Sequence, residues 1–223
     1  MIKIAAFDLD GTIADTMPLC MEAFCESVSQ YVGHELTEKE VVAAFGLNEI
    51  GMVKAVVEER EKQEPAIRDF YARYELLHRE VTEPFPGILD LFAFLKEKNM
   101  ILALITGKGE KSCMISLRNL GLSEMFDEIR YGSELAPNKT ENIESLLEKY
   151  SVSKNEFCYV GDALQDIAAC RAAGVVCYSA AWQESADPVI LEESNPNHVF
   201  CSVKGLHEYL ERQVIRRTFC GQE

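Results

Sequence analysis

The sequence predicts an α/β fold in which helices cover a parallel β-sheet and an all-helical segment is inserted after the first strand. The first observation is a short, uninterrupted apolar run at residues 4–7, typical of a strand buried on both faces. The second is that residues 16–83 carry helical patterns without a convincing strand. The third is the alternation of strands and helices from residue 88 onward. The 223 residues, 48% of them hydrophobic, suffice for one such domain with an insert.

The segment 16–83 is expected to fold into four helices. Asp15 or Thr16 is placed to cap the first of them, and Gly33 ends it. Thr37, followed three residues later by Glu40, has the pattern of a capping box. The helices are expected at residues 16–31, 38–44, 49–60 and 64–82.

The sequence Pro-Phe-Pro-Gly at residues 84–87 ends this helical segment. Strands are then expected at residues 100–105, 128–131, 157–160, 175–178 and 198–200. Helices are expected at residues 88–98, 108–120, 140–150, 164–173 and 206–217. We therefore expect residues 1–15 and 84–223 to form one core and residues 16–83 to form a cap, with hinges at 15–16 and 83–86.

Composition limits the partners of the chain. Lys and Arg number 22 and Asp and Glu number 37, so the formal charge is −15, which disfavours nucleic acid and anionic membranes as partners. The eight cysteines include no Cys-x-x-Cys pair, which argues against a structural zinc site and favours reduced thiols. No apolar run reaches membrane-spanning length. These observations predict a cytoplasmic protein.

Polar residues follow four of the expected strands or open the helices after them. Because the carboxyl ends of parallel strands meet at one edge of a sheet, we expect these residues to converge there. Two carboxylates about 4 Å apart repel by roughly 4 kcal/mol at an effective dielectric constant near 20, so Asp8 and Asp10 require a shared proton, a metal ion, or a phosphoryl group beside a metal. The four groups are Asp8-x-Asp10-Gly11-Thr12, Thr106-Gly107, Lys139 and Gly161-Asp162 with Asp166.

Each group has a role in phosphoryl transfer. Asp8 can attack phosphorus, and Asp10 can protonate the leaving oxygen and then activate water. Mg²⁺ prefers oxygen ligands, which Asp8, the Asp10 backbone carbonyl and Asp162 could supply with Asp166 behind them. Thr106, with Gly107 and the helix that follows, offers a hydroxyl and N–H groups to a phosphate, and Lys139 supplies positive charge.

Taken singly, these residues have plainer explanations. An Asp-Gly pair is usually a turn, Thr106-Gly107 is usually a loop, and Lys139 alone is most often a solvated surface lysine. Asp162 after Gly161 could simply cap a helix. The occurrence of all four groups in this order, each at a strand end, favours the phosphoryl-transfer interpretation.

Together these motifs resemble the four motifs of the haloacid dehalogenase superfamily of hydrolases, and the helical segment resembles that superfamily's cap, as in phosphoglycolate phosphatases and β-phosphoglucomutases. The resemblance implies a Rossmann-like core, Mg²⁺ dependence, an aspartyl-phosphate intermediate and the roles given above. One departure concerns Lys139, which is followed by Thr140 where this branch usually has proline. Lys139 stays the expected lysine, and Lys108 is expected to be an auxiliary phosphate contact.

The resemblance also separates the possible reactions. The dehalogenases lack a second acid. The phosphonate-cleaving branch replaces this acid with a small residue and uses a cap lysine, for which Lys54 would be the candidate. The presence of Asp10 argues against both reactions. The cap loop 45–49 is similar to that of phosphoglycolate-type phosphatases. We therefore expect hydrolysis of a small, phosphoglycolate-like phosphorylated metabolite, with Asn48 in this loop contacting the leaving group. A β-phosphoglucomutase-like mutase and a non-catalytic ligand-binding relative are the alternatives. A monomer or weak homodimer is expected.

Overall fold

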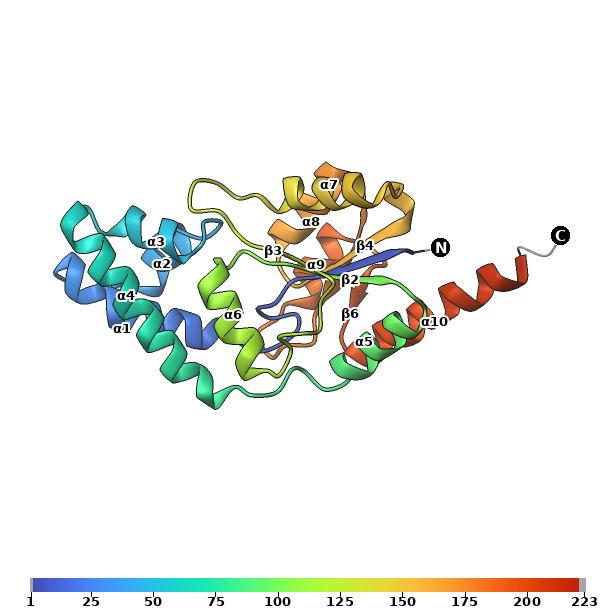
Figure 1. The fold of residues 1–223 in the computed structure, drawn as a ribbon, viewed down its shortest axis with the longest axis horizontal. Coiled ribbons are helices and arrows are strands. Elements are labelled where there is room, and N and C mark those ends of the chain that lie inside the picture. Colours follow the sequence, from blue (N-terminus) through green and yellow to red (C-terminus); the bar gives the residue numbers. More distant parts are fainter. Residues whose placement is uncertain (1, 221–223) are drawn as a thin grey trace.

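The computed structural model describes residues 2–220, with side chains up to residue 213, as a parallel sheet flanked by helices and extended at one end by a helical cap (Figure 1). The strands are β1 (Ile4–Phe7), β2 (Ile101–Ile105), β3 (Glu128–Arg130), β4 (Phe157–Gly161), β5 (Val176–Ala180) and β6 (Val199–Phe200). The cap helices are α1 (Met17–Val32), α2 (Glu38–Ala43), α3 (Glu49–Val56) and α4 (Arg60–Leu77). The core helices are α5 (Ile88–Glu97), α6 (Glu110–Asn119), α7 (Lys139–Tyr150), α8 (Leu164–Ala173), α9 (Pro188–Ser194) and α10 (Val203–Cys220).

The strand order is β3-β2-β1-β4-β5-β6, and every pairing between neighbours is parallel. The first strand is therefore central, between β2 and β4. Phe7 is in register with Leu104 of β2 and with Val160 of β4. The residues that follow these three strands consequently emerge at the same edge, as the sequence predicted.

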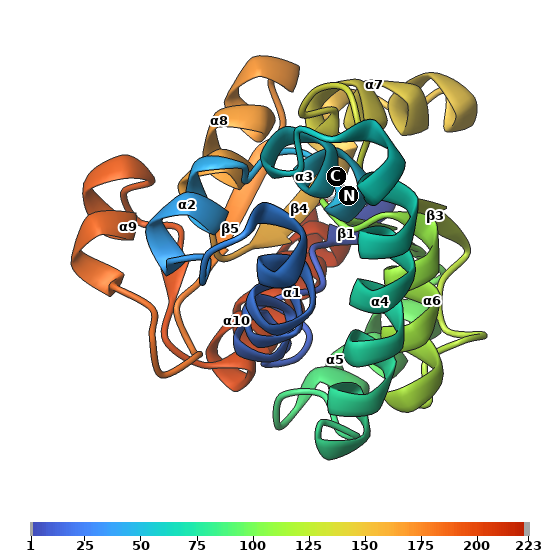
Figure 2. The same cartoon turned by 90° about the vertical axis from the view of Figure 1, so that its left-hand side faces the viewer.

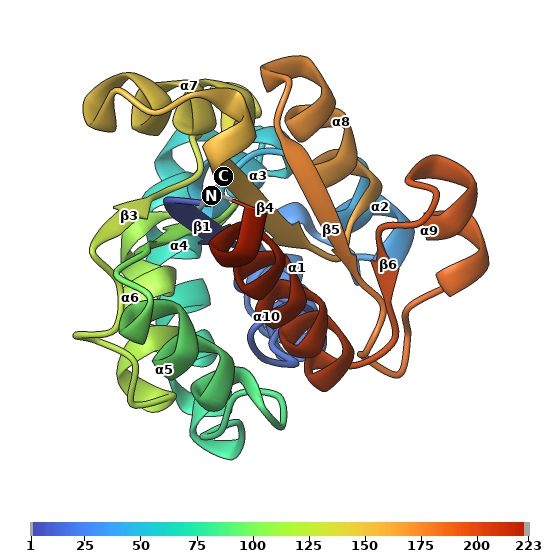
Figure 3. The same ribbon diagram turned by 90° about the vertical axis from the view of Figure 1, so that its right-hand side faces the viewer.

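Helices cover both faces of the sheet (Figure 3). Successive side chains of a strand point to opposite faces, so Ala5 and Phe7 pack against α5, α6 and α10, and Ile4 and Ala6 pack against α7 and α8. All four β1 residues are fully buried. The apolar run at residues 4–7 is thus a strand buried on both faces, and the predicted α/β class is confirmed.

The outer strand β3 is tied to α7 by one carboxylate. Glu128 accepts hydrogen bonds from Arg130 (2.8 Å), from the Tyr150 hydroxyl (2.6 Å) and from Lys149. Burial alone would raise the pKa of Glu128, but these three donors outweigh it and lower the pKa to about 2. Glu128 is therefore ionised throughout the physiological range.

The cap helices have an apolar core of their own, in which α1 and α4 are the main partners (Figure 2). Phe24 of α1 and Phe70 of α4 meet edge to face at 5.8 Å between ring centroids. Met52 and Val53 of α3, and Val57 directly after it, are buried in the same cluster. The two chain crossings between cap and core are hydrogen-bonded neighbours, because the Phe85 N–H donates to the Ile13 carbonyl at 2.8 Å.

Several element boundaries differ from expectation. Helix α4 begins at Arg60, because Val57 is extended and ends α3 early, and it closes in a 3₁₀ turn at His78–Glu80. Helix α9 was not predicted; it is two turns long, too short for a clear period, and its signal is Asp187, whose side chain caps the Val189 and Ile190 N–H groups. Within residues 2–220, no helix combines the length and apolarity needed to cross a membrane.

Candidate active site

Three carboxylates gather beyond the carboxyl ends of β1 and β4. Asp8, Asp162 and Asp166 each place one oxygen within 4.8 Å of the others. Asp8 directly follows β1, Asp162 directly follows β4, and Asp166 lies in the first turn of α8. Asp8 and Asp166 are buried, so their mutual repulsion is poorly screened by solvent.

Lys139, the first residue of α7, bridges two of these carboxylates. Its Nζ is 2.5 Å from an oxygen of Asp8 and 2.5 Å from an oxygen of Asp166. Burial alone would lower the pKa of Lys139, but the charges of Asp166 and Asp8 outweigh it and raise the pKa above its ordinary value. Lys139 therefore remains a cation. Asp166 also accepts hydrogen bonds from the Tyr159 hydroxyl and the Ala163 N–H, so its orientation is fixed.

Asp162 is held by residues from two other loops. One of its oxygens accepts a hydrogen bond from the Thr12 hydroxyl at 3.1 Å, and the other accepts one from Gln183 Nε2 at 2.7 Å. Gly11 allows this approach: a Cβ there would lie 2.3 Å from an Asp162 oxygen, and its φ is +71°. The loop after β1 thus has to contain glycine for the carboxylate after β4 to reach it.

The electrostatics of the cluster suit a divalent cation. Burial, followed by the charges of Asp8 and Asp166, raises the pKa of Asp162 to about 8. Burial raises the pKa of Asp8 to about 6, although Lys139 acts in the opposite direction. One lysine does not balance three carboxylates, and hard oxygen donors are the ligands that Mg²⁺ prefers. The residues therefore fit such an ion.

Asp10 lies apart from this cluster, on the side of the cap. Its Oδ1 accepts a hydrogen bond from the Thr16 hydroxyl at 2.5 Å and is 3.2 Å from Lys108 Nζ. Thr16 occupies the N-cap position of α1, but its side chain makes no capping bond, so the expected capping role is wrong: the hydroxyl is used by Asp10 instead. The metal role expected for the Asp10 backbone carbonyl stays a prediction.

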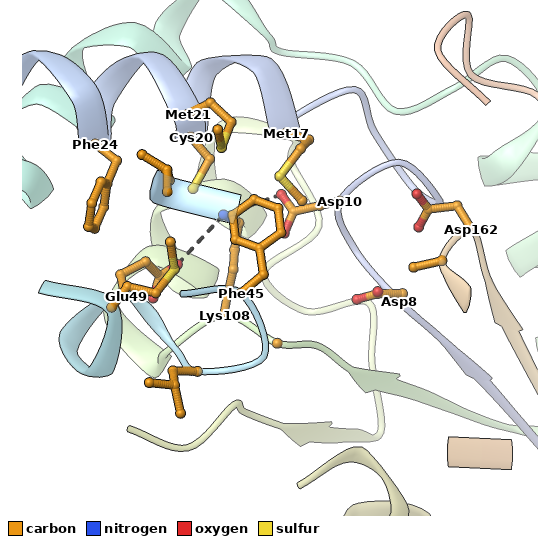
Figure 4. Close-up of a pocket in the computed structure, with 15 residues that line it drawn as sticks. Asp8, Asp10, Met17, Cys20, Met21, Phe24, Phe45, Glu49, Lys108 and Asp162 are labelled. Atoms are coloured by element: carbon orange, nitrogen blue, oxygen red, sulfur yellow. Dashed lines mark ion pairs between the residues drawn. The ribbon is translucent and has the colours of Figure 1, made fainter. Parts of the chain in front are cut away.

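Lys108 connects the core to the cap (Figure 4). Its Nζ is 3.2 Å from Asp10, 3.7 Å from Oε1 of Glu49 at the start of α3, and 4.5 Å from the centre of the Tyr74 ring. Only 4% of Lys108 is exposed. Burial alone would lower its pKa, but the neighbouring charges, Asp10 foremost, raise it well above the ordinary value. Lys108 is therefore a buried cation between two carboxylates.

Glu49 is fixed by further contacts with the core. Its Oε2 accepts a hydrogen bond from the Gly109 N–H at 2.9 Å, and its Oε1 accepts one from the Ser112 hydroxyl at 2.6 Å. These donors lie at the N-terminal end of α6, where a negative charge is favoured. A second ion pair between cap and core joins Lys54 and Glu134 at 2.6 Å. Lys54, the cap lysine considered above for phosphonate cleavage, is therefore paired with a glutamate at the surface of the core.

Thr106 and Gly107 lie where the sequence placed them, between β2 and α6. The Thr106 hydroxyl accepts a hydrogen bond from the Lys108 N–H at 3.1 Å, and its proton can still be donated to a phosphate oxygen. The backbone of Gly107 is packed against Gly132, at which a Cβ would lie 1.9 Å from the Gly107 carbonyl oxygen. Helix α6 begins at Glu110 rather than at the expected residue 108, so Lys108 belongs to the loop.

Asn48 has structural partners for both ends of its amide. Its Oδ1 accepts a hydrogen bond from the Gly51 N–H and caps α3, and its Nδ2 donates to the Gly132 carbonyl at 3.1 Å. Asn48 is not among the residues that line the site cavity, whereas the next residue, Glu49, is. Its contact with a leaving group stays a prediction.

A cavity of about 140 Å³ lies between the carboxylates and the cap (Figure 4). Asp8, Asp10, Asp162 and Lys108 line it from the core. The cap contributes Glu49 and apolar side chains: Met17, Cys20, Met21, Phe24, Val41, Phe45, Leu47 and Met52. A molecule that placed its phosphate at Asp8 would extend its remaining part into this cavity.

The contacts of four site residues were not predicted from the sequence, although Thr12 was named in the first motif and Glu49 lies in the cap loop 45–49. Thr12 and Thr16 stand within or next to the first motif, and this position was their only available signal. Glu49 and Gln183 carried no local pattern, because each acts through a partner more than 20 residues away, at Lys108 and Asp162 respectively.

Residues 5–180 match the model of the family described as haloacid dehalogenase-like hydrolase. The chain is 29% identical over 184 residues to a phosphoglycolate phosphatase of Chromobacterium violaceum, covering 78% of this chain and 82% of the relative. It is 27% identical over 177 residues to pyrophosphatase PpaX of Halalkalibacterium halodurans, covering 78% and 81%. A solved haloacid dehalogenase-like family hydrolase from Streptococcus pneumoniae superposes with a TM-score of 0.72 at 20% identity, covering 94% and 98%, and therefore shares the fold.

Proposed function

The chain belongs to the haloacid dehalogenase-like hydrolases, and we propose that it is a Mg²⁺-dependent phosphatase that hydrolyses a small phosphorylated metabolite through an aspartyl-phosphate. One observation carries the proposal: Asp8 stands beside Lys139 and within 4.8 Å of the Asp162 cluster, while Asp10 faces the cap. This arrangement supports Asp8 as the nucleophile, Lys139 as the cation that binds the phosphoryl group, and Asp10 as the second acid.

In the first step, the Asp8 carboxylate attacks phosphorus and the bond from phosphorus to the leaving oxygen breaks. Asp10 gives its proton to that oxygen, so the leaving group departs as a neutral alcohol. In the second step, Asp10 takes a proton from water, which attacks phosphorus and breaks its bond to Asp8. Thr16 and Lys108 hold Asp10 on the leaving-group side throughout.

Lys139 and Thr106 bind the phosphoryl oxygens in this proposal. Lys139 is fixed by Asp166, so its charge is already in place before substrate arrives. Asp8 and Asp162 would hold Mg²⁺, with Asp166 behind them, and the ion would neutralise charge on the phosphoryl group. We further propose that residues 16–83 act as a cap that closes over the substrate, moving about the hydrogen-bonded crossings near Ile13 and Phe85.

Phosphate release from a panel of small phosphate esters tests this function. The panel includes phosphoglycolate and pyrophosphate, the compounds in the names of the relatives. We expect release by the wild type with Mg²⁺, loss of release with EDTA, and at least a 10³-fold loss in Asp8→Asn. Asp8→Asn keeps the shape of the side chain, so a thermal melt serves as its folding control. Release that Asp8→Asn leaves unchanged would refute the proposal.

A further inference from the structure

We propose that the cap cavity selects a phosphate ester whose leaving group is uncharged and largely apolar, and that it rejects an anionic leaving group. This inference rests on the proposed function, because it concerns the part of the substrate that Asp10 protonates. It adds the chemical class of that part, which the four motifs do not specify. Three properties of the cavity support it: the charges of its wall, its apolar composition and its size.

The wall of the cavity offers no unpaired cation. Within the described part of the chain, Lys108 is the one basic side chain that lines the cavity. Lys108 is 3.7 Å from Glu49 and 3.2 Å from Asp10. In the proposed first step Asp10 carries the proton that it donates, so the charge of Lys108 is matched by that of Glu49. Asp8 and Asp162 lie at the opposite end, where the phosphoryl group binds. A carboxylate on the leaving group would therefore meet the Glu49 carboxylate and no unpaired cation.

Glu49 cannot easily move out of the way. Its two oxygens accept hydrogen bonds from the Gly109 N–H and the Ser112 hydroxyl, and only 4% of the residue is exposed. Displacing it would leave a buried carboxylate without these partners. The negative charge is consequently a fixed part of the wall, and a second negative charge placed nearby at low dielectric would be repelled.

The remainder of the wall is apolar. Helix α1 contributes Met17, Met21 and Phe24, and the segments around α2 and α3 contribute Phe45 and Met52. Cys20 also lines the cavity, and burial raises the pKa of its thiol to about 12, so it is neutral. A polar leaving group would lose its water here without replacement hydrogen bonds, whereas an apolar one would gain from burial.

The volume of the cavity indicates the size of leaving group that it holds. Its volume is about 140 Å³. Apolar cavities of about 150 Å³ take up benzene, so a leaving group up to about the size of one aromatic ring fits. Methionine side chains are flexible, which allows the wall to adapt to related shapes.

Three alkyl esters separate charge from size. Phosphoglycolate, propyl phosphate and benzyl phosphate each release a primary alcohol, so their chemistry is comparable. The leaving group of the first carries a carboxylate, that of the second is uncharged and of similar length, and that of the third fills the cavity. For the wild type with Mg²⁺, we expect kcat/KM to be at least tenfold higher for propyl and benzyl phosphate than for phosphoglycolate.

The matched variants are Met21→Lys and Met21→Leu, because Met21 is a half-buried residue of the wall. The lysine supplies the missing cation, and we expect it to raise kcat/KM for phosphoglycolate relative to propyl phosphate at least tenfold. Met21→Leu should keep the wild-type ratio. The wild-type comparison stands by itself if Met21→Lys does not fold.

The outcomes distinguish this inference from the function on which it rests. A wild-type preference for phosphoglycolate, or an equal shift in both Met21 variants, overturns the inference alone. Failure of the wild type to release more phosphate than Asp8→Asn from any of the three esters overturns the proposed function and the inference with it.

Discussion

Replacing Lys108 by methionine should destabilise the protein, because the substitution leaves Asp10 and Glu49 buried without their shared cation. At an effective dielectric constant of 20, ion pairs at 3.2 Å and 3.7 Å correspond to attractions of about 5 and about 4.5 kcal/mol. Relief of the desolvation of Lys108 offsets part of this sum. Breaking a buried pair by removing one partner typically costs about 3–5 kcal/mol, and we expect Lys108→Met to fall in that range.

Urea unfolding measures this effect. The single Trp182 reports on the core through fluorescence, because its indole N–H donates to the Thr12 carbonyl beside the site, and far-UV circular dichroism reports on the helices of cap and core together. The two probes should give coincident transitions if unfolding is two-state. The free energy then follows from the midpoint and the slope of the transition.

Two further variants make the prediction specific. Lys111→Met is the control. Lys111 lies 4.5 Å from the centre of the Tyr71 ring, the same distance that separates Lys108 from the centre of the Tyr74 ring. Unlike Lys108, Lys111 is exposed and takes part in no ion pair among the described residues. It should cost less than about 1 kcal/mol. Adding Glu49→Gln to Lys108→Met should recover about 1–2 kcal/mol, since it removes one of the two orphaned charges. Strictly additive losses would refute the reasoning.

Three other substitutions test separate parts of the structure. Gly132→Ala should destabilise the protein by at least about 3 kcal/mol in urea unfolding, because the new Cβ would lie 1.9 Å from the Gly107 carbonyl oxygen. Glu128→Gln should cost about 2 kcal/mol at pH 7. The folded pKa of Glu128, about 2, lies below its ordinary 4.5, so its contribution is present above pH 4.5 and lost as pH falls toward 2; melts across this range should show the variant and wild type converging. Mg²⁺ at a hundredfold excess over its dissociation constant should stabilise the wild type by about 2.7 kcal/mol, and Asp162→Asn should abolish most of this gain in thermal melts.

Each of these three has an outcome that contradicts it. Wild-type stability in Gly132→Ala would mean that the two loops can separate without loss. A constant difference between Glu128→Gln and the wild type down to pH 2 would assign the cost to packing rather than charge. An undiminished Mg²⁺ shift in Asp162→Asn would place the ion elsewhere.

The core and its motifs were accessible from the sequence because their signals are local. Strand β1 is a run of apolar residues, and Asp8 and Asp10 stand out in the polar segment that directly follows it. Parallel pairing then brings the ends of β2 and β4 to the same edge, so Thr106 and Asp162 follow from topology alone.

The cap side of the site was not accessible in this way. Which cap residue meets Lys108 depends on how two helical layers dock, and docking is set by side-chain shape across the interface rather than by the period of either helix. The sequence therefore indicated the loop 45–49 but not that Glu49, at its end, forms the ion pair with Lys108. Asp15 or Thr16 was expected to cap α1, whereas the Thr16 hydroxyl donates to Asp10 across the turn that joins them.

The central position of β1 has a consequence for how the protein folds. Its two neighbours begin at residues 101 and 157, so Ile4 pairs with residues 97 and 153 positions away. The cap helices, by contrast, contact one another within residues 17–77. Closing long loops costs more conformational entropy than forming local contacts, and folding slows as sequence separation grows. We therefore expect the cap to form early and the edge carrying Asp8 to be completed late, once a strand from each half of the core has closed around it.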